Sequence, residues 1–513
     1  MRRMMLVSAV ALCAALLTWS AVMSSEAPLG VWQNRLFGDL AGYEPDPGSF
    51  YLAAAHDLEF GRPALYVGHP GTPLMLLLDG VQRGLYAFSP DTGLSWTAFS
   101  ARNLPAITIA SKLLITVLHL VSFGLLFAFA LELLRDELAA GLACLAYATS
   151  LPVLFYLSRI SVEPLMMICL FGAFVALWRW EELASAGDPR RGRVFAALAG
   201  VAAITGAVTK FNFLAPLPAL LLLEAALAPR ATGESGKGVR ERWLGLLALT
   251  SAGVITLWFW SHWIEWQAFF AFWSGVPAGW NSAARPWNLL PAPTAAGALP
   301  LCEFAFVSVA LVGWIDVLRR REGRARVLFV SAFLGYSLLV FGYSVILDRS
   351  FLLFHYFLPA TGILAVFFGH ATARMLRGLT RSVPVAVAAC AGWLLLVHGL
   401  AVYAVLDSRL HDIYAYQELR PAFEWIARLA PAQRIGVRAE IREAPEFATK
   451  LSLLHSIMLP PGEGRNGSSL RREFELMFVP ISSANADALA DPLFVPVLGA
   501  ELFAIDGDAP PVP

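Results

Sequence analysis

Residues 105–131 read PAITIASKLLITVLHLVSFGLLFAFAL, an apolar run whose only Lys, Arg, Asp or Glu is Lys112. An α-helix needs about 20 mostly apolar residues to cross a bilayer, so this run predicts a transmembrane helix. The whole chain of 513 residues has the same character, with 58% hydrophobic residues, 15% charged residues and a mean hydropathy of +0.62. Soluble domains have about 25% charged residues. We therefore expect a membrane protein, and the net charge of zero suggests no nucleic-acid partner.

Further apolar segments predict a polytopic all-α membrane protein with about 11 transmembrane helices. The first segment follows Met1-Arg2-Arg3, as in a signal peptide, but its length and the lack of a clean cleavage site favour an anchor. The segment at 194–209 is short, since its residues reach only about 24 Å as a helix. The expected spans besides 105–131 lie near 4–24, 138–157, 163–180, 194–209, 211–228, 243–261, 301–318, 327–347, 354–372 and 383–405.

The distribution of arginine predicts the orientation of these spans. Short cytoplasmic loops carry an excess of Lys and Arg, and alternate loops here are arginine-rich, as in Arg190-Arg191-Gly192-Arg193 and Arg319-Arg320-Arg321. The near absence of lysine suggests a GC-rich bacterial genome. We therefore expect a bacterial inner-membrane protein with a cytoplasmic N-terminus and a periplasmic C-terminus.

This topology divides the chain into two domains. Residues 1–405 form the transmembrane domain, and its first outer loop covers 25–104. Residues 406–513 form an extracytoplasmic C-terminal domain. In it, Tyr416–Leu429 has the pattern of an amphipathic helix and Arg434–Val437 that of the start of a strand, so we expect a small α/β domain.

Two carboxylates in the first outer loop are candidates for chemistry. Glu44 and Asp46 stand in Glu44-Pro45-Asp46-Pro47, whose prolines keep the backbone extended. A helix over Phe50–Leu58 is expected to follow, lying on the bilayer surface. An enzyme acting on a lipid-linked substrate needs a base at this level, but an acid that merely stabilises a helix start is an equal alternative. His69, in the rigid turn Gly68-His69-Pro70-Gly71-Thr72-Pro73, binds phosphate, orients a carboxylate or serves only the turn.

Charged residues also lie at the outer ends of later spans. Arg159 and Glu163 flank a short turn near the membrane boundary, where ionisable groups are often functional. The alternative is an ion pair that caps a helix. Lys210, in Thr209-Lys210-Phe211, is expected to meet an anion such as a lipid phosphate, unless it snorkels to the headgroups.

A last group lies around residues 348–356. Arg349, which follows Asp348, offers a bidentate fork for phosphate. His355 and Tyr356 add donors, or else belong to an aromatic belt at the interface. No P-loop, GxGxxG, HExxH or CxxC site stands out, which argues against ATP-driven transport, nicotinamide redox chemistry and zinc hydrolysis.

In chain order, these segments resemble the GT-C superfamily of polytopic glycosyltransferases, which includes protein O-mannosyltransferases and aminoarabinose transferases. The order and sidedness of the motifs carry the resemblance more than any one of them. In that family the first-loop carboxylate acts as catalytic base or aligns the acceptor, and the donor is a polyprenyl-phosphate sugar. The matching segments are the acid Asp46, His69–Leu74, Ser158–Pro164, Thr209–Phe211 and His355–Pro359.

The resemblance implies an inverting glycosyltransferase that moves a sugar from a polyprenyl-phosphate donor to a glycan, lipid or protein acceptor on the periplasmic face. Asp46 would be the base and Glu44 the second choice, because many family members have adjacent acids where this chain has Glu-Pro-Asp. No cofactor is certain, although some branches use a divalent metal ion, and we assign no metal ligands. By resemblance, Lys210, Arg349 and Arg159 would bind the donor phosphate, and His69, Glu163, Asp348, His355 and Tyr356 would line the pocket.

Two other functions use the same residues. A flippase or transporter for a lipid-linked sugar would share the phosphate contacts, but it is expected to show an inverted repeat or broken helices around a midplane site. No internal repeat is evident in the sequence. A non-catalytic membrane subunit would keep the fold without the chemistry.

Overall fold

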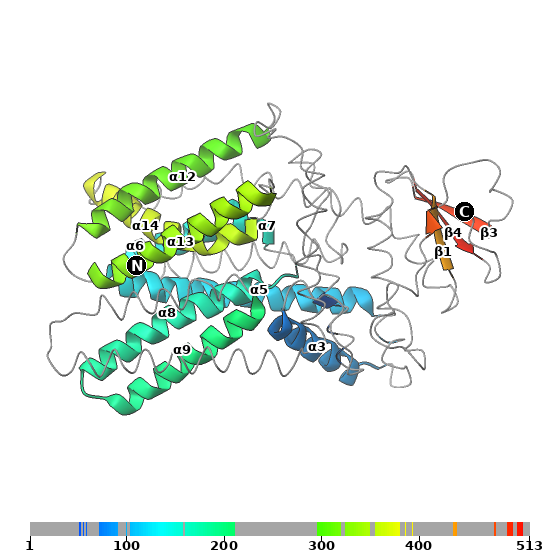
Figure 1. Ribbon diagram of the computed structural model, residues 1–513, viewed down its shortest axis with the longest axis horizontal. Coiled ribbons are helices and arrows are strands. Elements are labelled where there is room, and N and C mark those ends of the chain that lie inside the picture. The colour runs from blue at the N-terminus through cyan, green and yellow to red at the C-terminus, as the bar shows by residue number, and fades with distance from the viewer. Residues whose placement is uncertain are drawn as a thin grey trace.

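The structure is a computed structural model of the full chain, and its ribbon marks the residues whose placement it describes (Figure 1). In the helical part, isolated residues Tyr51, Leu52, Ala55, Leu58, Phe99, Val385 and Gly392 are described as well. The continuous described ranges are 71–90, 103–156, 160–210, 295–319, 324–348 and 354–379, followed by the strands 434–438, 477–478, 490–495 and 500–505.

The described part of the chain before residue 400 is helical. Two of its helices are long and apolar enough to cross a membrane, over Ala106–Leu134 and Glu163–Leu183. The predicted total of about 11 spans stays a prediction, because several expected spans, such as 4–24 and 211–228, lie outside the described residues. The helices are α3 (Thr72–Ala87), α5 (Leu104–Leu134), α6 (Glu137–Ala148), α7 (Leu151–Tyr156), α8 (Glu163–Ser185), α9 (Pro189–Thr209), α12 (Ala295–Leu318), α13 (Arg324–Asp348) and α14 (Phe354–Leu379).

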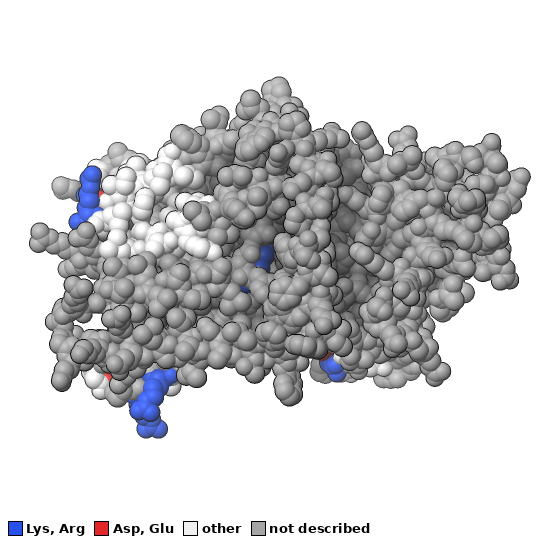
Figure 2. All heavy atoms as spheres, in the orientation of Figure 1, with Lys and Arg blue, Asp and Glu red and all other residues white. Residues whose placement is uncertain are grey.

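Helix α5 has the two faces expected of a helix in lipid. One face exposes an apolar stripe at intervals of four residues, and the opposite face buries polar side chains in the bundle, as ionisable and polar groups in membranes do. The exposed stripe is Ile109, Leu113, Val117 and Val121, and the buried polar face is Thr108, Ser111, Lys112, Thr116, His119 and Ser122. The described part of α12 likewise exposes Leu311, Val312 and Ile315, and Figure 2 shows an uncharged surface there.

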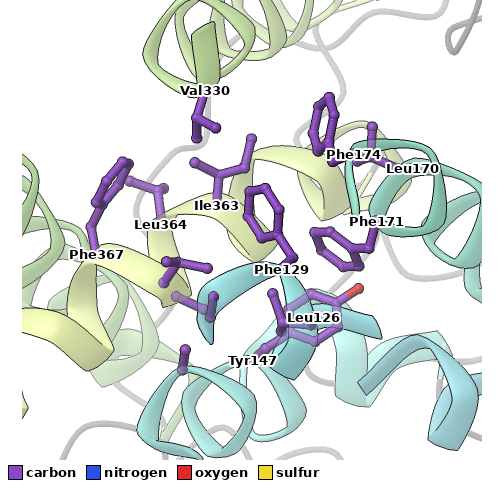
Figure 3. Packing of buried hydrophobic residues seen from close by; sticks show 14 of the residues in the cluster. Leu126, Phe129, Tyr147, Leu170, Phe171, Phe174, Val330, Ile363, Leu364 and Phe367 are labelled. Carbon is purple, nitrogen blue, oxygen red and sulfur yellow. The ribbon is translucent and has the colours of Figure 1, made fainter. Parts of the chain in front are cut away.

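Aromatic rings fill the core between α5 and α8. The ring centroid of Phe129 lies 5.5 Å from that of Phe171, 5.4 Å from that of Phe174 and 5.2 Å from that of Trp178. Figure 3 shows Phe129, Phe171 and Phe174 converging with Ile363 from α14. Offset ring pairs of this kind stabilise a core beyond the area they bury, so they fix how α5 lies against α8.

Two glycines let α14 approach its neighbours at backbone distance. A Cβ atom at Gly369 would fall on the carbonyl oxygen of Ala139 in α6, and one at Gly313 of α12 would fall on that of Phe367. Small residues at helix interfaces are typical of membrane bundles, where van der Waals packing drives association. Both contacts therefore depend on the missing side chain.

We expect Gly369→Ala to destabilise the protein by about 1–3 kcal/mol, because the new methyl group must push α14 away from α6. The matched control is Gly141→Ala on α6, where a Cβ atom meets nothing within 4 Å. Thermal unfolding of the purified protein in detergent checks this pair. Equal melting temperatures for the two variants would show that the close approach of α14 is not required.

Charged side chains from four helices meet at one end of the bundle, which we call the arginine end and define by Arg135, Arg326 and Arg377. Arg326 donates to Glu181 (3.2 Å) and Glu182 (3.3 Å), and its guanidinium lies 5.2 Å from the centroid of the Trp178 ring. Arg135 donates to Glu182 as well (2.8 Å). Figure 2 shows further Lys and Arg side chains projecting where α8 turns into α9. All these residues flank loops predicted to lie on the cytoplasmic side, so the structure brings the predicted inner loops together.

Asp136 ties α6 to α14 at the same end. Its side chain accepts hydrogen bonds from the backbone N–H groups of Leu138 and Ala139. It also accepts hydrogen bonds from Nη1 (2.6 Å) and Nη2 (2.7 Å) of Arg377. Burial would raise the pKa of this carboxyl, but the hydrogen bonds from Arg377 and from the two N–H groups together hold its pKa below the usual value. The N-cap of α6 is thus also an anchor for α14.

Helix α9 is longer than the apolar span expected at 194–209, and the short length of that span stays a prediction. The helix begins at Pro189 and has 21 residues, which at 1.5 Å per residue gives about 31 Å. The apolar pattern missed its first turn because that turn holds Arg190, Arg191 and Arg193. Asp188 caps it by accepting a hydrogen bond from the N–H of Arg191 (3.2 Å).

The helix expected over Phe50–Leu58 is supported at its described residues, but its surroundings differ from the expectation. Tyr51, Leu52, Ala55 and Leu58 are helical. They belong to a buried cluster with Leu74, Met75 and Leu78 of α3 rather than lying on the bilayer surface. The sequence of an apolar face does not reveal whether lipid or protein covers it. In this structure α3 covers it.

Four strands form a sheet in the order β2-β1-β4-β3, and the expected strand start at Arg434 is confirmed. β1 is parallel to β2 and antiparallel to β4, with Arg434 opposite Ile505. Figure 1 shows the sheet beyond the end of the bundle where α3 lies. The helix expected over 416–429 is outside the described residues, so the α/β class of residues 406–513 and the boundary at 405 stay predictions. The strands are β1 (Arg434–Arg438), β2 (Met477–Phe478), β3 (Ala490–Val495) and β4 (Ala500–Ile505).

Candidate functional site

A buried ion pair joins two turns at the end of the bundle opposite the arginine end. Lys210 Nζ lies 2.5 Å from Glu163 Oε1, and the two side chains are only 3% and 1% exposed. Glu163 is the first residue of α8, and Lys210 is the extended residue that ends α9. Two charges leave water only where close geometry offsets their desolvation, so this pair is an unusual feature of the fold.

The first outer loop docks beside this pair. Gly71 has a left-handed backbone (φ 48°), and its N–H donates to the carbonyl oxygen of Thr209, the neighbour of Lys210 (3.2 Å). A Cβ atom at Gly71 would lie 2.7 Å from Cε1 of Tyr51, so glycine lets the tyrosine ring pack here. The amide Nε2 of Gln82 in α3 donates to the carbonyl oxygen of Leu52 (3.2 Å). The loop, α3 and the end of α9 therefore form one packed unit.

The predicted residues of the first outer loop and its neighbouring turn flank this unit in sequence. Asp46 precedes Tyr51 by five residues and His69 precedes Gly71 by two. Arg159 directly precedes Ile160, which lies in the same buried cluster as Tyr51. The side chains of Glu44, Asp46, His69 and Arg159 themselves are outside the described residues.

The remaining predicted residues stand at the ends of two later helices. Asp348 is the last residue of α13, and His355 and Tyr356 lie in the first turn of α14. Their side chains, and Arg349 as a whole, are outside the described residues. Because α13 begins and α14 ends at the arginine end, their junction lies toward the opposite end, where Glu163 and Lys210 are.

The structure joins two residues to which the sequence assigned separate roles. Glu163 was expected to line the pocket or to pair with Arg159, and Lys210 to meet a lipid phosphate. Their mutual contact could have been suspected from two opposite charges at neighbouring outer turns. His119 was not among the predicted residues. It could have been found as a histidine inside an apolar span, on the same helical face as Lys112.

No protein-family model matches the chain, and no curated protein matches its sequence. Solved structures match its fold. ArnT from Cupriavidus metallidurans bound to undecaprenyl phosphate matches with a TM-score of 0.58 at 15% identity, covering 99% of both chains. The same protein in the apo state gives a TM-score of 0.54 at 16% identity, covering 96% of this chain and 97% of that one.

A weaker match links the chain to the apo oligosaccharyltransferase of Archaeoglobus fulgidus, with a TM-score of 0.49 at 12% identity. It covers 90% of this chain, which spans 60% of the length of the archaeal protein. The matches to ArnT extend over nearly the whole of both chains. The chain therefore has the fold of ArnT, which is a GT-C fold. This confirms the fold that the sequence resemblance implied.

Proposed function

We propose that this protein is a membrane glycosyltransferase that moves a sugar from a polyprenyl-phosphate donor to a hydroxyl group of a glycan, lipid or protein on the periplasmic face of a bacterial inner membrane. The observation that carries the proposal is the buried pair of Lys210 and Glu163, with the first outer loop docked against it. Support for the donor class comes from ArnT, which shares the fold and has been solved with undecaprenyl phosphate.

The chemistry needs a base near this pair, and chain length limits where the base can be. A residue spans at most about 3.6 Å, so the five residues from Asp46 to Tyr51 can reach about 18 Å and the two from His69 to Gly71 about 7 Å. Both anchors belong to the packed unit beside Lys210. The chain can therefore bring these residues to the pair, and by resemblance Asp46 is the proposed base, Glu44 the second choice and His69 part of the pocket.

The reaction is a single displacement at the anomeric carbon. Asp46 takes the proton of the acceptor hydroxyl while its oxygen forms the new bond to the sugar. The bond between the anomeric carbon and the phosphate oxygen breaks on the opposite face, so the configuration inverts. The leaving polyprenyl phosphate gains negative charge, and cations fixed in advance stabilise it best.

Glu163 would hold the Lys210 ammonium in place for this role, because the two groups are in buried contact at 2.5 Å. Arg349 and Arg159 are the proposed additional cations, and Asp348, His355 and Tyr356 complete the proposed pocket.

A reconstituted assay tests the proposal. Purified protein in proteoliposomes receives a polyprenyl-phosphate donor with a labelled sugar and membrane extract from a strain lacking the gene, which supplies the undecorated acceptor. We expect polyprenyl phosphate to be released in step with label appearing on the acceptor. Movement of intact donor across the bilayer would instead identify a flippase. Neither cleavage nor movement would identify a non-catalytic subunit.

A further inference from the structure

Three buried polar atoms, in α5 and around the start of α8, have no hydrogen-bond partner within the described part of the chain. They are Nδ1 of His119, Oγ of Ser161 and Oε2 of Glu163, and their residues are at most 2% exposed. Buried polar atoms in native proteins are nearly always paired, with protein or with ordered water. Other polar groups on the buried face of α5 follow this rule, since Ser111 and Ser122 donate to carbonyl oxygens of their own helix.

The three atoms come from segments that pack against each other. Leu118, the neighbour of His119, lies in one buried cluster with Ile160 and Val162, which flank Ser161. His119 also contacts the chain just before this segment, because its Nε2 lies 3.4 Å from the carbonyl oxygen of Tyr156.

The alignment of α5 with α8 sets their relative depth. Deeper in the bundle, Phe129 stacks on Trp178 and Glu132 pairs with Arg179, so the two helices run in the same direction with an offset of 47 to 49 residues. This offset places His119 level with residues 166–168, about one to one and a half turns, or roughly 5–8 Å, below Glu163. Both side chains are thus buried within about two helical turns of each other in depth, and the ring of Phe123, 6.1 Å from that of His119, packs on Tyr147 of α6.

The chemistry of the three atoms defines what fits between them. A carbonyl oxygen only accepts, so Nε2 of His119 carries the hydrogen, and Nδ1 of the neutral ring is an acceptor. Glu163 Oε2 is an acceptor too, whereas the Ser161 hydroxyl both donates and accepts. The two acceptors, His119 Nδ1 and Glu163 Oε2, therefore each need a hydrogen-bond donor. A water molecule has two protons to give and accepts one in return, and buried waters make about three hydrogen bonds.

We propose that His119, Ser161 and Glu163 form a buried water-binding site beside the ion pair. Water bound there holds the free oxygen of Glu163, whose other oxygen binds Lys210, and so fixes the orientation of the carboxylate. His119 is then a positioning residue that acts through water and does not touch the sugar. The water site stands on the geometry alone, and only its effect on transfer rests on the proposed function.

An experimental structure in lipid nanodiscs, at a resolution that shows ordered waters, tests the site directly. We expect water within hydrogen-bond distance of His119 Nδ1 and Glu163 Oε2, and its loss in His119→Leu. Ser122→Ala is the matched control, because this hydroxyl lies on the same face of α5 and bonds only within its helix. Density for a cation, direct contact of these atoms with other protein groups, or an empty site would overturn the proposal.

Transfer kinetics test the positioning role separately. His119→Leu is expected to lower kcat by about 10- to 100-fold, because a displaced carboxylate displaces Lys210, and to change the pH profile of the reaction. His119→Gln keeps one donor and one acceptor and should recover most of the rate. If the leucine and glutamine variants behave alike, the role assigned to His119 is wrong. If wild-type protein transfers no sugar but the water is seen, only the proposed function fails.

Discussion

Asp46→Asn is expected to slow sugar transfer by about 10²- to 10⁴-fold, the usual contribution of a general base. The amide accepts no proton, so it cannot act as the base. Because it has the shape of the carboxylate, the folded structure should be unaffected. The measurement is the initial rate of transfer from labelled donor in proteoliposomes, with the melting temperature as a check on folding. Donor binding should persist, since the phosphate contacts are assigned to other residues.

Glu44→Gln is the matched control for that variant. It removes a carboxylate two residues away in the same Pro-containing loop, and we expect a rate within a few-fold of wild type. If Glu44→Gln loses the activity and Asp46→Asn keeps it, Glu44 is the base. Full activity in both variants would remove the first-loop acids from the mechanism altogether.

Lys210→Met is expected to destabilise the protein by about 3–5 kcal/mol, because it leaves the buried Glu163 carboxylate without its counter-charge. Unfolding in detergent measures the loss. Arg191→Met is the control, since Arg191 is 78% exposed and its contact with Asp188 is 3.5 Å long. Exposed ion pairs of that kind contribute about 0–1 kcal/mol. Equal losses in the two variants would show that the buried pair has no special weight.

The double variant Lys210→Met/Glu163→Gln separates stability from chemistry. Removing both charges takes away the uncompensated carboxylate, so most of the stability should return. Transfer should stay low, because the cation proposed to face the leaving phosphate is absent. A double variant that regains both stability and transfer would show that the pair serves the fold alone.

Runs of apolar residues predicted several of the described helices well, because burial in lipid or protein needs the same side chains. The expected span 105–131 became Leu104–Leu134, and 163–180 became Glu163–Ser185. The failures have physical causes. Helix α9 begins at Pro189 with a turn that holds three arginines, and no apolar pattern marks that turn. The predicted span 138–157 covers two helices, α6 and α7, separated at Thr149 and Ser150.

The candidate site was harder to predict than the fold. Charge at the outer ends of spans directed attention to Glu163 and Lys210 one by one. Their contact joins residues 47 positions apart and follows from how α8 packs on α9, which no local pattern encodes. His119 was not predicted as a site residue, because a single histidine does not interrupt an apolar run.

The hydrogen bond between the Gly71 N–H and the Thr209 carbonyl oxygen uses main-chain atoms only. Evolutionary drift should therefore treat its two ends differently. Among related sequences, any residue small enough for the buried position 209 can still offer the carbonyl, whereas position 71 must combine a left-handed backbone with room for an aromatic ring. A sequence survey should find glycine retained at 71 while 209 varies, and that asymmetry would mark other proteins in which the same junction is built.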